Sequence, residues 1–211
     1  ITPVSSGRSQ PSVEAIVALN PDLVIGAEGF HSKILSSINS LGIASLPLKI
    51  DRWDRLENAA YTLRKMLSSS DALDQKLAAT CPSTSVDRQV STQRQRVLVL
   101  VGVSPKMSPS SESWSGSLLA RHHLINASEG ISGGSEFSGY VTMSRERMLS
   151  VAADAVIAVN PSGGVESYRA SIQQLFPKLN RQDFIEMDYY GFINPGSLKS
   201  IALACQRLRS L

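Results

Sequence analysis

The chain has 211 residues, of which 42% are apolar, and its 21 Lys and Arg against 18 Asp and Glu leave a net charge of +3. This composition supports a packed core and argues against extensive disorder. The weak and evenly spread positive charge gives no basis for nucleic-acid binding, and no apolar run approaches the ~18 residues of a membrane-spanning helix.

The first third of the chain alternates helical and strand patterns. Residues 12–19 form an amphipathic pattern typical of a short helix, with Ser12 as N-cap and Glu14 in the first turn. Residues 22–26 (DLVIG) are an apolar run typical of a strand buried on both faces of a parallel sheet. A helix over 33–41, a strand over 43–48 and a helix over 53–67 are predicted next. This alternation predicts an α/β fold.

A polar segment then separates two lobes. Residues 70–95 are predicted to contain a connecting helix, because Ala72, Leu73, Leu77 and Ala78 recur at helical spacing. Pro82 should end or kink this helix. The sequence therefore predicts a partial N-terminal lobe over 1–69, the connection over 70–95 and a C-terminal lobe over 96–211.

The C-terminal lobe begins with the strongest buried-strand pattern of the chain, VLVLVGV at 97–103. Further elements follow at intervals that again favour α/β, with mainly parallel strands. We expect helices over 116–122, 144–152, 168–176 and 195–211, and strands over 155–159 and 184–187.

Residues 12–26 and 144–158 form an internal repeat. Five of their fifteen positions are identical, including a serine cap and a glutamate two positions later. Chance similarity between short helix–strand units is the alternative explanation. Two lobes of like build would enclose a cleft, and ligands of open α/β sheets bind beyond the carboxyl ends of strands. The candidate loops are 27–31, 104–114, 160–164 and 188–192.

The two cysteines, Cys81 and Cys205, lie 124 positions apart. They allow one disulfide in an oxidising compartment, and two buried free thiols are the alternative. Because no CxxC motif or cysteine–histidine cluster is present, no zinc site is predicted. His122 and His123 stand at a predicted helix end, where cations are favoured, and are not expected to bind a ligand.

Residues 130–134 (GISGG) satisfy the G-x-S-x-G pattern of a hydrolase nucleophile. That motif requires a strand directly before it, a helix directly after it and a later histidine. Both flanks are loop-like and no histidine follows, so we do not predict an enzyme.

Several segments resemble parts of one protein family, and they occur in the same order as in that family. PSVEAIVALNPDLVIG resembles the N-lobe signature of the periplasmic substrate-binding proteins for ferric siderophores and vitamin B12. RVLVLVGVSP, GSLLARHHLINAS, GYVTMSRERMLSVAADAVIAV and MDYYGFINPGSLKSIALACQRL are similar to successive parts of the family's C-lobe. The resemblance implies two three-layer α/β lobes joined by a long helix. The family's initial strand–helix–strand unit is absent here, so an incomplete N-lobe is expected.

This resemblance also implies a function. The chain would be the substrate-binding component of an ABC importer, a monomer without catalytic activity or an intrinsic cofactor. It would capture a metal chelate in the interlobe cleft and deliver it to a membrane permease. A ferric siderophore is the first choice, since a mildly basic protein suits an anionic chelate; cobalamin is second and haem third. The protein would be periplasmic, or exported and lipid-anchored. The alternative is a truncated relative that serves interaction or sensing without chelate binding.

The resemblance assigns roles to two groups of residues. Glu14 and Glu146 match the glutamates that dock onto permease arginines; the alternative is that they complement helix dipoles. The second group would contact the ligand, because aromatic and polar side chains in loops suit a flat or polar chelate. For the aromatic residues, packing in the core is the alternative. The second group comprises Tyr140, Asp188, Tyr189, Tyr190, Trp114, Glu28, His31 and Phe192, the last standing where some relatives carry an arginine.

Overall fold

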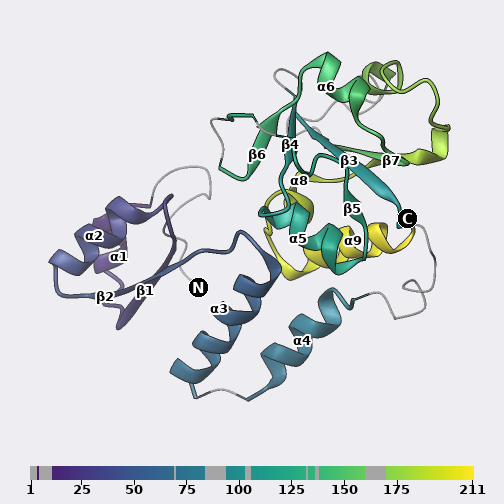
Figure 1. Ribbon diagram of the computed structural model, residues 1–211. Coiled ribbons are helices and arrows are strands. Elements are labelled where there is room, and N and C mark those ends of the chain that lie inside the picture. Colours follow the sequence, from purple (N-terminus) through teal and green to yellow (C-terminus); the bar gives the residue numbers. More distant parts are fainter. Residues whose placement is uncertain are drawn as a thin grey trace. The chain divides into compact units, whose positions relative to one another are not determined.

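The computed structural model describes residues 4, 11–68, 70–83, 94–102, 106–131, 133–135, 138–159 and 170–211. The chain divides into two compact units, residues 1–50 and 51–211, which are described separately (Figure 1). No helix within these ranges combines the length and the apolar character needed to cross a membrane.

The smaller unit contains two helix–strand pairs. These are α1 (Val13–Val17), β1 (Leu23–Ala27), α2 (Ser32–Ser40) and β2 (Ala44–Leu48). The two strands are parallel, with Leu23 opposite Ala44. Helix α2 packs against both strands and against α1, and Ile16, Leu35 and Ile38 form the buried core. This small α/β unit agrees with the predicted order of elements.

Strand β1 differs from its prediction in burial. Its residues are partly buried or exposed, and the side chain of Ile25 is 47% exposed. The prediction that DLVIG is buried on both faces is therefore wrong for the described part of the chain. The physical reason is that α1 and α2 are short and cover this two-stranded sheet only in part.

The larger unit is built on a six-stranded sheet with the order β6-β4-β3-β7-β8, and β5 also pairs with β3. Strands β5, β3, β7 and β8 are parallel, whereas β4 pairs antiparallel with β3 and with β6. The strands are β3 (Arg96–Val101), β4 (Met107–Pro109), β5 (Ile125–Asn126), β6 (Tyr140–Thr142), β7 (Ala155–Val159) and β8 (Phe184–Glu186). The sheet is thus mainly parallel, as predicted.

The core of this unit lies along β3 and β7. Every residue from Val97 to Val101 and from Ala155 to Val159 is buried, and Val99 pairs with Ile157. The predicted buried strand at 97–103 is confirmed as far as Val101, and position 103 lies outside the described residues. A strand pair buried on both faces requires a helical layer on each side.

Helices supply those two layers (Figure 1). On one side lies α6 (Arg145–Ser150), whose Met148 packs with Leu98, Leu100 and Ile172. On the other side lie α5 (Trp114–Arg121) and α9 (Leu198–Arg209). A 3₁₀ turn (Arg181–Asp183) precedes β8, and the short segment α8 (Tyr189–Phe192) follows it. The helix expected over 168–176 is described only from residue 170 onward.

Helices α3 (Trp53–Met66) and α4 (Ala72–Thr80) belong to the larger unit. The sequence interpretation placed 53–67 in the N-terminal lobe, whereas the two compact units meet between Ile50 and Asp51. Contacts with α5 explain the difference. The Trp53 backbone N–H donates to Ser117 Oγ at 3.0 Å, and the Arg121 guanidinium lies 4.3 Å from the centroid of the Trp53 ring.

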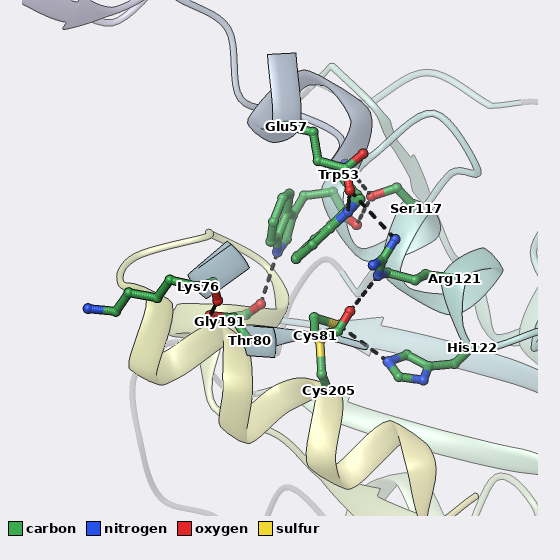
Figure 2. The surroundings of a disulfide bond; sticks show 11 residues. Trp53, Glu57, Lys76, Thr80, Cys81, Ser117, Arg121, His122, Gly191 and Cys205 are labelled. Atoms are coloured by element: carbon green, nitrogen blue, oxygen red, sulfur yellow. Dashed lines mark hydrogen bonds and ion pairs between the residues drawn. A yellow bond between two sulfur atoms is a disulfide. The ribbon is translucent and has the colours of Figure 1, made fainter. Parts of the chain in front are cut away.

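The end of α4 follows from its sequence. The helix stops at Thr80, with Cys81 as its C-cap, and Pro82 comes next, so the predicted helix end at this proline is confirmed. Cys81 forms a disulfide with Cys205 of α9, which settles the alternative between a disulfide and two free thiols (Figure 2). The disulfide ties the α3–α4 pair covalently to the last helix. Residues 84–93 of the expected connection lie outside the described residues.

Replacing both cysteines by alanine is expected to lower the free energy of unfolding by ~2–5 kcal/mol, because the bond removes the closure entropy of a long loop from the unfolded chain. Urea denaturation followed by circular dichroism measures this change. Reducing agent should bring the wild-type midpoint to that of the variant and leave the variant unchanged. Equal midpoints for the oxidised wild type and the variant would contradict the prediction.

Candidate functional site

The internal repeat is visible as two matching helix starts. Ser12 caps α1 and accepts a hydrogen bond from the Ala15 N–H at 3.1 Å, and Ser144 caps α6 and accepts one from the Arg147 N–H at 3.3 Å. Each helix carries a glutamate in its first turn and leads into a parallel strand, β1 or β7. The repeat is therefore a repeat of structure, in keeping with the N-cap preference for serine.

Glu14 and Glu146 occupy equivalent positions in these turns, and both are exposed. The pKa of Glu14 is lowered chiefly by the hydrogen bond that Ser12 Oγ donates to Oε2 at 2.6 Å, and then by its own backbone N–H. For Glu146 the backbone N–H is the larger cause of the lowered pKa and Ser144 the smaller. Both side chains are therefore exposed carboxylates at neutral pH, held near a helix N-terminus.

Three tyrosines gather in the larger unit. Tyr140 begins β6, and Tyr189 and Tyr190 follow β8, with ring centroids 5.4 Å apart and nearly perpendicular planes. Burial raises the pKa of Tyr140 to about 12, and the neighbouring Tyr189 contributes to the increase. Tyr190 is 60% exposed. The cluster thus offers one exposed ring and, at Tyr140, a hydroxyl that keeps its proton at neutral pH.

Trp114 and Phe192 support the segment that carries Tyr189 and Tyr190 from the core of the larger unit. Trp114 is buried and its Nε1–H donates to the Gly191 carbonyl at 2.9 Å, while Ser115 Oγ donates to the Phe192 carbonyl at 2.6 Å. Phe192 is completely buried. Gly191 has φ +95°, and a Cβ there would collide with the Ser200 backbone. In the larger unit these side chains pack the core and fix the segment, so neither Trp114 nor Phe192 presents its ring to solvent.

The candidate residues of the smaller unit lie in the turn between β1 and α2. His31 Nδ1 accepts a hydrogen bond from the Ala27 N–H at 2.9 Å, and the Phe30 ring meets the His31 ring edge-on at 4.9 Å between centroids. Because Nδ1 is an acceptor, neutral His31 carries its proton on Nε2 and presents an N–H donor. Glu28 is exposed, and its backbone N–H donates to the Leu48 carbonyl.

A cavity of about 490 Å³ adjoins this turn. Its wall is mostly apolar, and among the described residues that line it only His31 has an ionisable side chain. It is lined by Val4, Pro11, Ile16, Leu19, Pro21, Leu23, Val24, Ile25, Gly26, Phe30, His31, Ile34 and Leu35. Of the sequence candidates, the structure therefore brings His31 to a cavity and Tyr140, Tyr189 and Tyr190 to one cluster. Asp188 is exposed beside that cluster.

His122 is a residue whose surroundings the sequence analysis missed. It stands at the end of α5, as predicted, but it is completely buried, and its Nε2 lies 3.5 Å from Cys81 Sγ. A signal was present, since His122 follows the apolar residues Leu118 and Leu119 by four and three positions and so shares their helix face. The GISGG motif has no strand directly before it, because β5 ends at Asn126; its serine lies outside the described residues.

The sequence is similar to those of known proteins. The sequence matches the family described as periplasmic binding protein over residues 2–186. It is 27% identical, over 158 residues, to a protein of Bacillus subtilis named as an ABC transporter substrate-binding lipoprotein, YhfQ; the match covers 71% of this chain and 49% of that protein. The chain thus spans about half the length of this curated relative.

Solved structures share the fold. An ABC transporter substrate-binding protein from Listeria monocytogenes has a TM-score of 0.73 at 15% identity, with 95% of this chain and 80% of that one covered. The vitamin B12 binding protein BtuF of Vibrio cholerae has a TM-score of 0.68 at 14% identity, with 100% and 80% covered. At these identities the likeness is one of fold.

The raised pKa of Tyr140 predicts a stability change at alkaline pH. The unfolded chain loses this proton near pH 10 and the folded protein near pH 12, so the stabilisation is fully present below pH 10 and is lost as the pH rises to 12. Between these two pH values, the free energy of unfolding of Tyr140→Phe should therefore rise by ~2 kcal/mol relative to that of wild type. Urea denaturation over this pH range tests it, with the exposed Tyr61→Phe as control. An equal trend in both variants would refute the assignment.

Proposed function

Because the chain belongs to the periplasmic binding protein family, we propose that it is the substrate-binding component of an ABC importer for a metal chelate. It acts by binding and delivery, without catalysis. The chelate is held by loop residues of its lobes, and the loaded protein hands it to a permease in the membrane.

The observation that carries this proposal is the tyrosine cluster. Tyr189 and Tyr190 follow the last strand of the sheet, which is the end where open α/β sheets bind ligands. Tyr190 is 60% exposed, while Trp114 and Phe192 support the neighbouring backbone from the core. A rigidly supported aromatic surface with hydroxyl groups suits a large, partly flat chelate.

The ligand-contacting set that we propose follows from exposure. It keeps Tyr140, Asp188, Tyr189, Tyr190, Glu28 and His31, which are partly or fully exposed. Trp114 and Phe192 support the set from the core and do not touch the chelate.

The hydrogen bond at His31 Nδ1 and the raised pKa of Tyr140 favour a ferric siderophore over haem. His31 uses the lone pair of Nδ1 within the protein and offers the N–H of Nε2, and Tyr140 keeps its phenolic proton. Both are suited to donate hydrogen bonds to the oxygen atoms of an anionic chelate, and neither is prepared to donate a lone pair to an open iron position. Cobalamin, which arrives with its metal already enclosed, is the second choice.

Glu14 and Glu146 serve as the docking carboxylates in this proposal. They are exposed, charged at neutral pH and placed on equivalent helix starts, so arginines of a permease can pair with both. The disulfide fits an oxidising compartment, and the Bacillus subtilis relative is named a lipoprotein. We therefore place the protein outside the cytoplasm, free in the periplasm or lipid-anchored. We further propose that it acts as a monomer.

Chelate binding is tested by quenching of tyrosine and tryptophan fluorescence with ferric siderophores, cobalamin and haem. One ferric siderophore should give saturable quenching, and Tyr190→Ala should weaken its binding at least about tenfold, since exposed aromatic anchors dominate such contacts. Tyr61→Ala, at a tyrosine of α3 that is also about half exposed, is the matched control. If no chelate gives saturable quenching, the alternative of an interaction or sensing module replaces this proposal.

Docking is tested separately with Glu14→Gln and Glu146→Gln, alone and combined. Each change should weaken binding of the loaded protein to the permease in lipid nanodiscs by about tenfold and leave chelate affinity unchanged. Glu129→Gln, another exposed glutamate, should change neither quantity. The assignment is wrong if the double variant docks as tightly as wild type, or if Glu129→Gln has the same effect.

A further inference from the structure

A buried cluster of sulfur and nitrogen atoms contains none of the residues proposed to contact the chelate. Cys81, His122 and Cys205 are each completely buried, and their ligand atoms all lie within 4.8 Å of one another. His122 Nε2 faces the disulfide at 3.5 Å from Cys81 Sγ (Figure 2). Two sulfur atoms and one imidazole nitrogen therefore meet at one buried position.

Three helices that are distant in sequence build the cluster. Cys81 caps the C-terminus of α4, His122 caps that of α5, and Cys205 lies within α9. Arg121, next to His122, donates through Nε to the Cys81 carbonyl at 2.6 Å, which fixes the α4 end against α5. The positions of the three side chains are therefore set by the packing of this unit as well as by the disulfide itself.

We propose that Cys81, His122 and Cys205 form a binding site for a thiophilic cation, Zn²⁺ or Cu⁺, when the disulfide is reduced. Two thiolates and one imidazole are the donors that these ions prefer. Disulfide sulfur carries no charge and is a poor ligand, so the oxidised protein cannot use this site. Oxidation and metal binding are mutually exclusive states of the same three residues.

The chemistry of the change balances. An external dithiol or phosphine supplies two electrons, the S–S bond breaks, and two protons give two thiols while the reductant is oxidised. The cation then replaces both thiol protons, which pass to the buffer, and takes the lone pair of neutral His122 as its third ligand. Zn²⁺ with two thiolates and one imidazole has no net charge, which suits a fully buried position.

Metal binding would preserve the connection that the disulfide provides. Both states join the end of α4 to α9, one by a covalent bond and the other through the ion. The reduced protein without metal lacks this link and should be the least stable of the three states. The proposed cation site lies within the larger unit, and none of its three residues belongs to the proposed ligand-contacting set.

Metal titration of the full chain tests the proposal. The protein is reduced under argon with a phosphine, and Zn²⁺ and Cu⁺ are each titrated in competition with a chromophoric chelator. We expect one ion per reduced chain and none per oxidised chain. His122→Asn should lower the affinity at least about tenfold. His123→Asn is the matched control, because asparagine tolerates the positive φ of +57° at that position.

A second measurement keeps the result interpretable if reduction loosens the fold. Co²⁺ added to the reduced protein should give thiolate-to-metal charge-transfer absorption, and Zn²⁺ should raise the melting temperature of the reduced wild type but not of Cys81→Ala/Cys205→Ala. The proposal fails if neither Zn²⁺ nor Cu⁺ binds. It also fails if His122→Asn binds as tightly as His123→Asn, or if metal restores no stability to the reduced chain.

Discussion

Burial of β3 and β7 on both faces is the constraint on which the larger unit depends. Their paired residues are apolar and inaccessible over five consecutive positions each, from Val97 to Val101 and from Ala155 to Val159. Such a pair is stable only if helices cover both sides, and the chain supplies α6 on one side and α5 with α9 on the other. The parallel course of β7 and β8 then places the tyrosine segment after β8, and α6, which carries Glu146, before β7.

The second face of this sheet is secured by polar and covalent contacts as well as by packing. Arg121 combines three of them, since its guanidinium stacks on Trp53, pairs with Glu57 at 3.9 Å and donates to the Cys81 carbonyl. Desolvation lowers the pKa of Arg121, and the charge of Glu57 opposes this effect only in part. The contacts and the disulfide together explain why α3 and α4 belong to the larger unit although they precede its first strand.

The sequence predicted those features that local patterns control. The serine caps, the acidic first turns and the buried strands at β3 and β7 depend on residues close together in the chain, and the structure confirms them. The failures concern long-range packing. The DLVIG pattern indicates apolar character but cannot say how much of a strand the neighbouring helices cover, so Ile25 is exposed where burial was expected.

In the candidate site, too, local patterns predicted some features, whereas others depend on long-range packing. Loop positions after strands pointed to Tyr189 and Tyr190, but the sequence could not separate them from Phe192, two residues further, which turns into the core. That reversal depends on Gly191 at φ +95° and on its contact with the distant Trp114. The burial of His122 likewise depends on α4 and α9, which reach α5 only in the folded protein.

The protons of His31 and Tyr140 link the packing of the fold to the kind of ligand that we propose. The Ala27 N–H fixes the proton of neutral His31 on Nε2, and burial keeps the proton of Tyr140 in place. Each constraint comes from the fold and does not depend on a ligand. An N–H or O–H donor in a binding site discriminates by the acceptors that a ligand brings, because a donor left unpaired on binding costs free energy. In our proposal, selectivity among chelates therefore depends on the oxygen atoms at the chelate's surface more than on its enclosed metal.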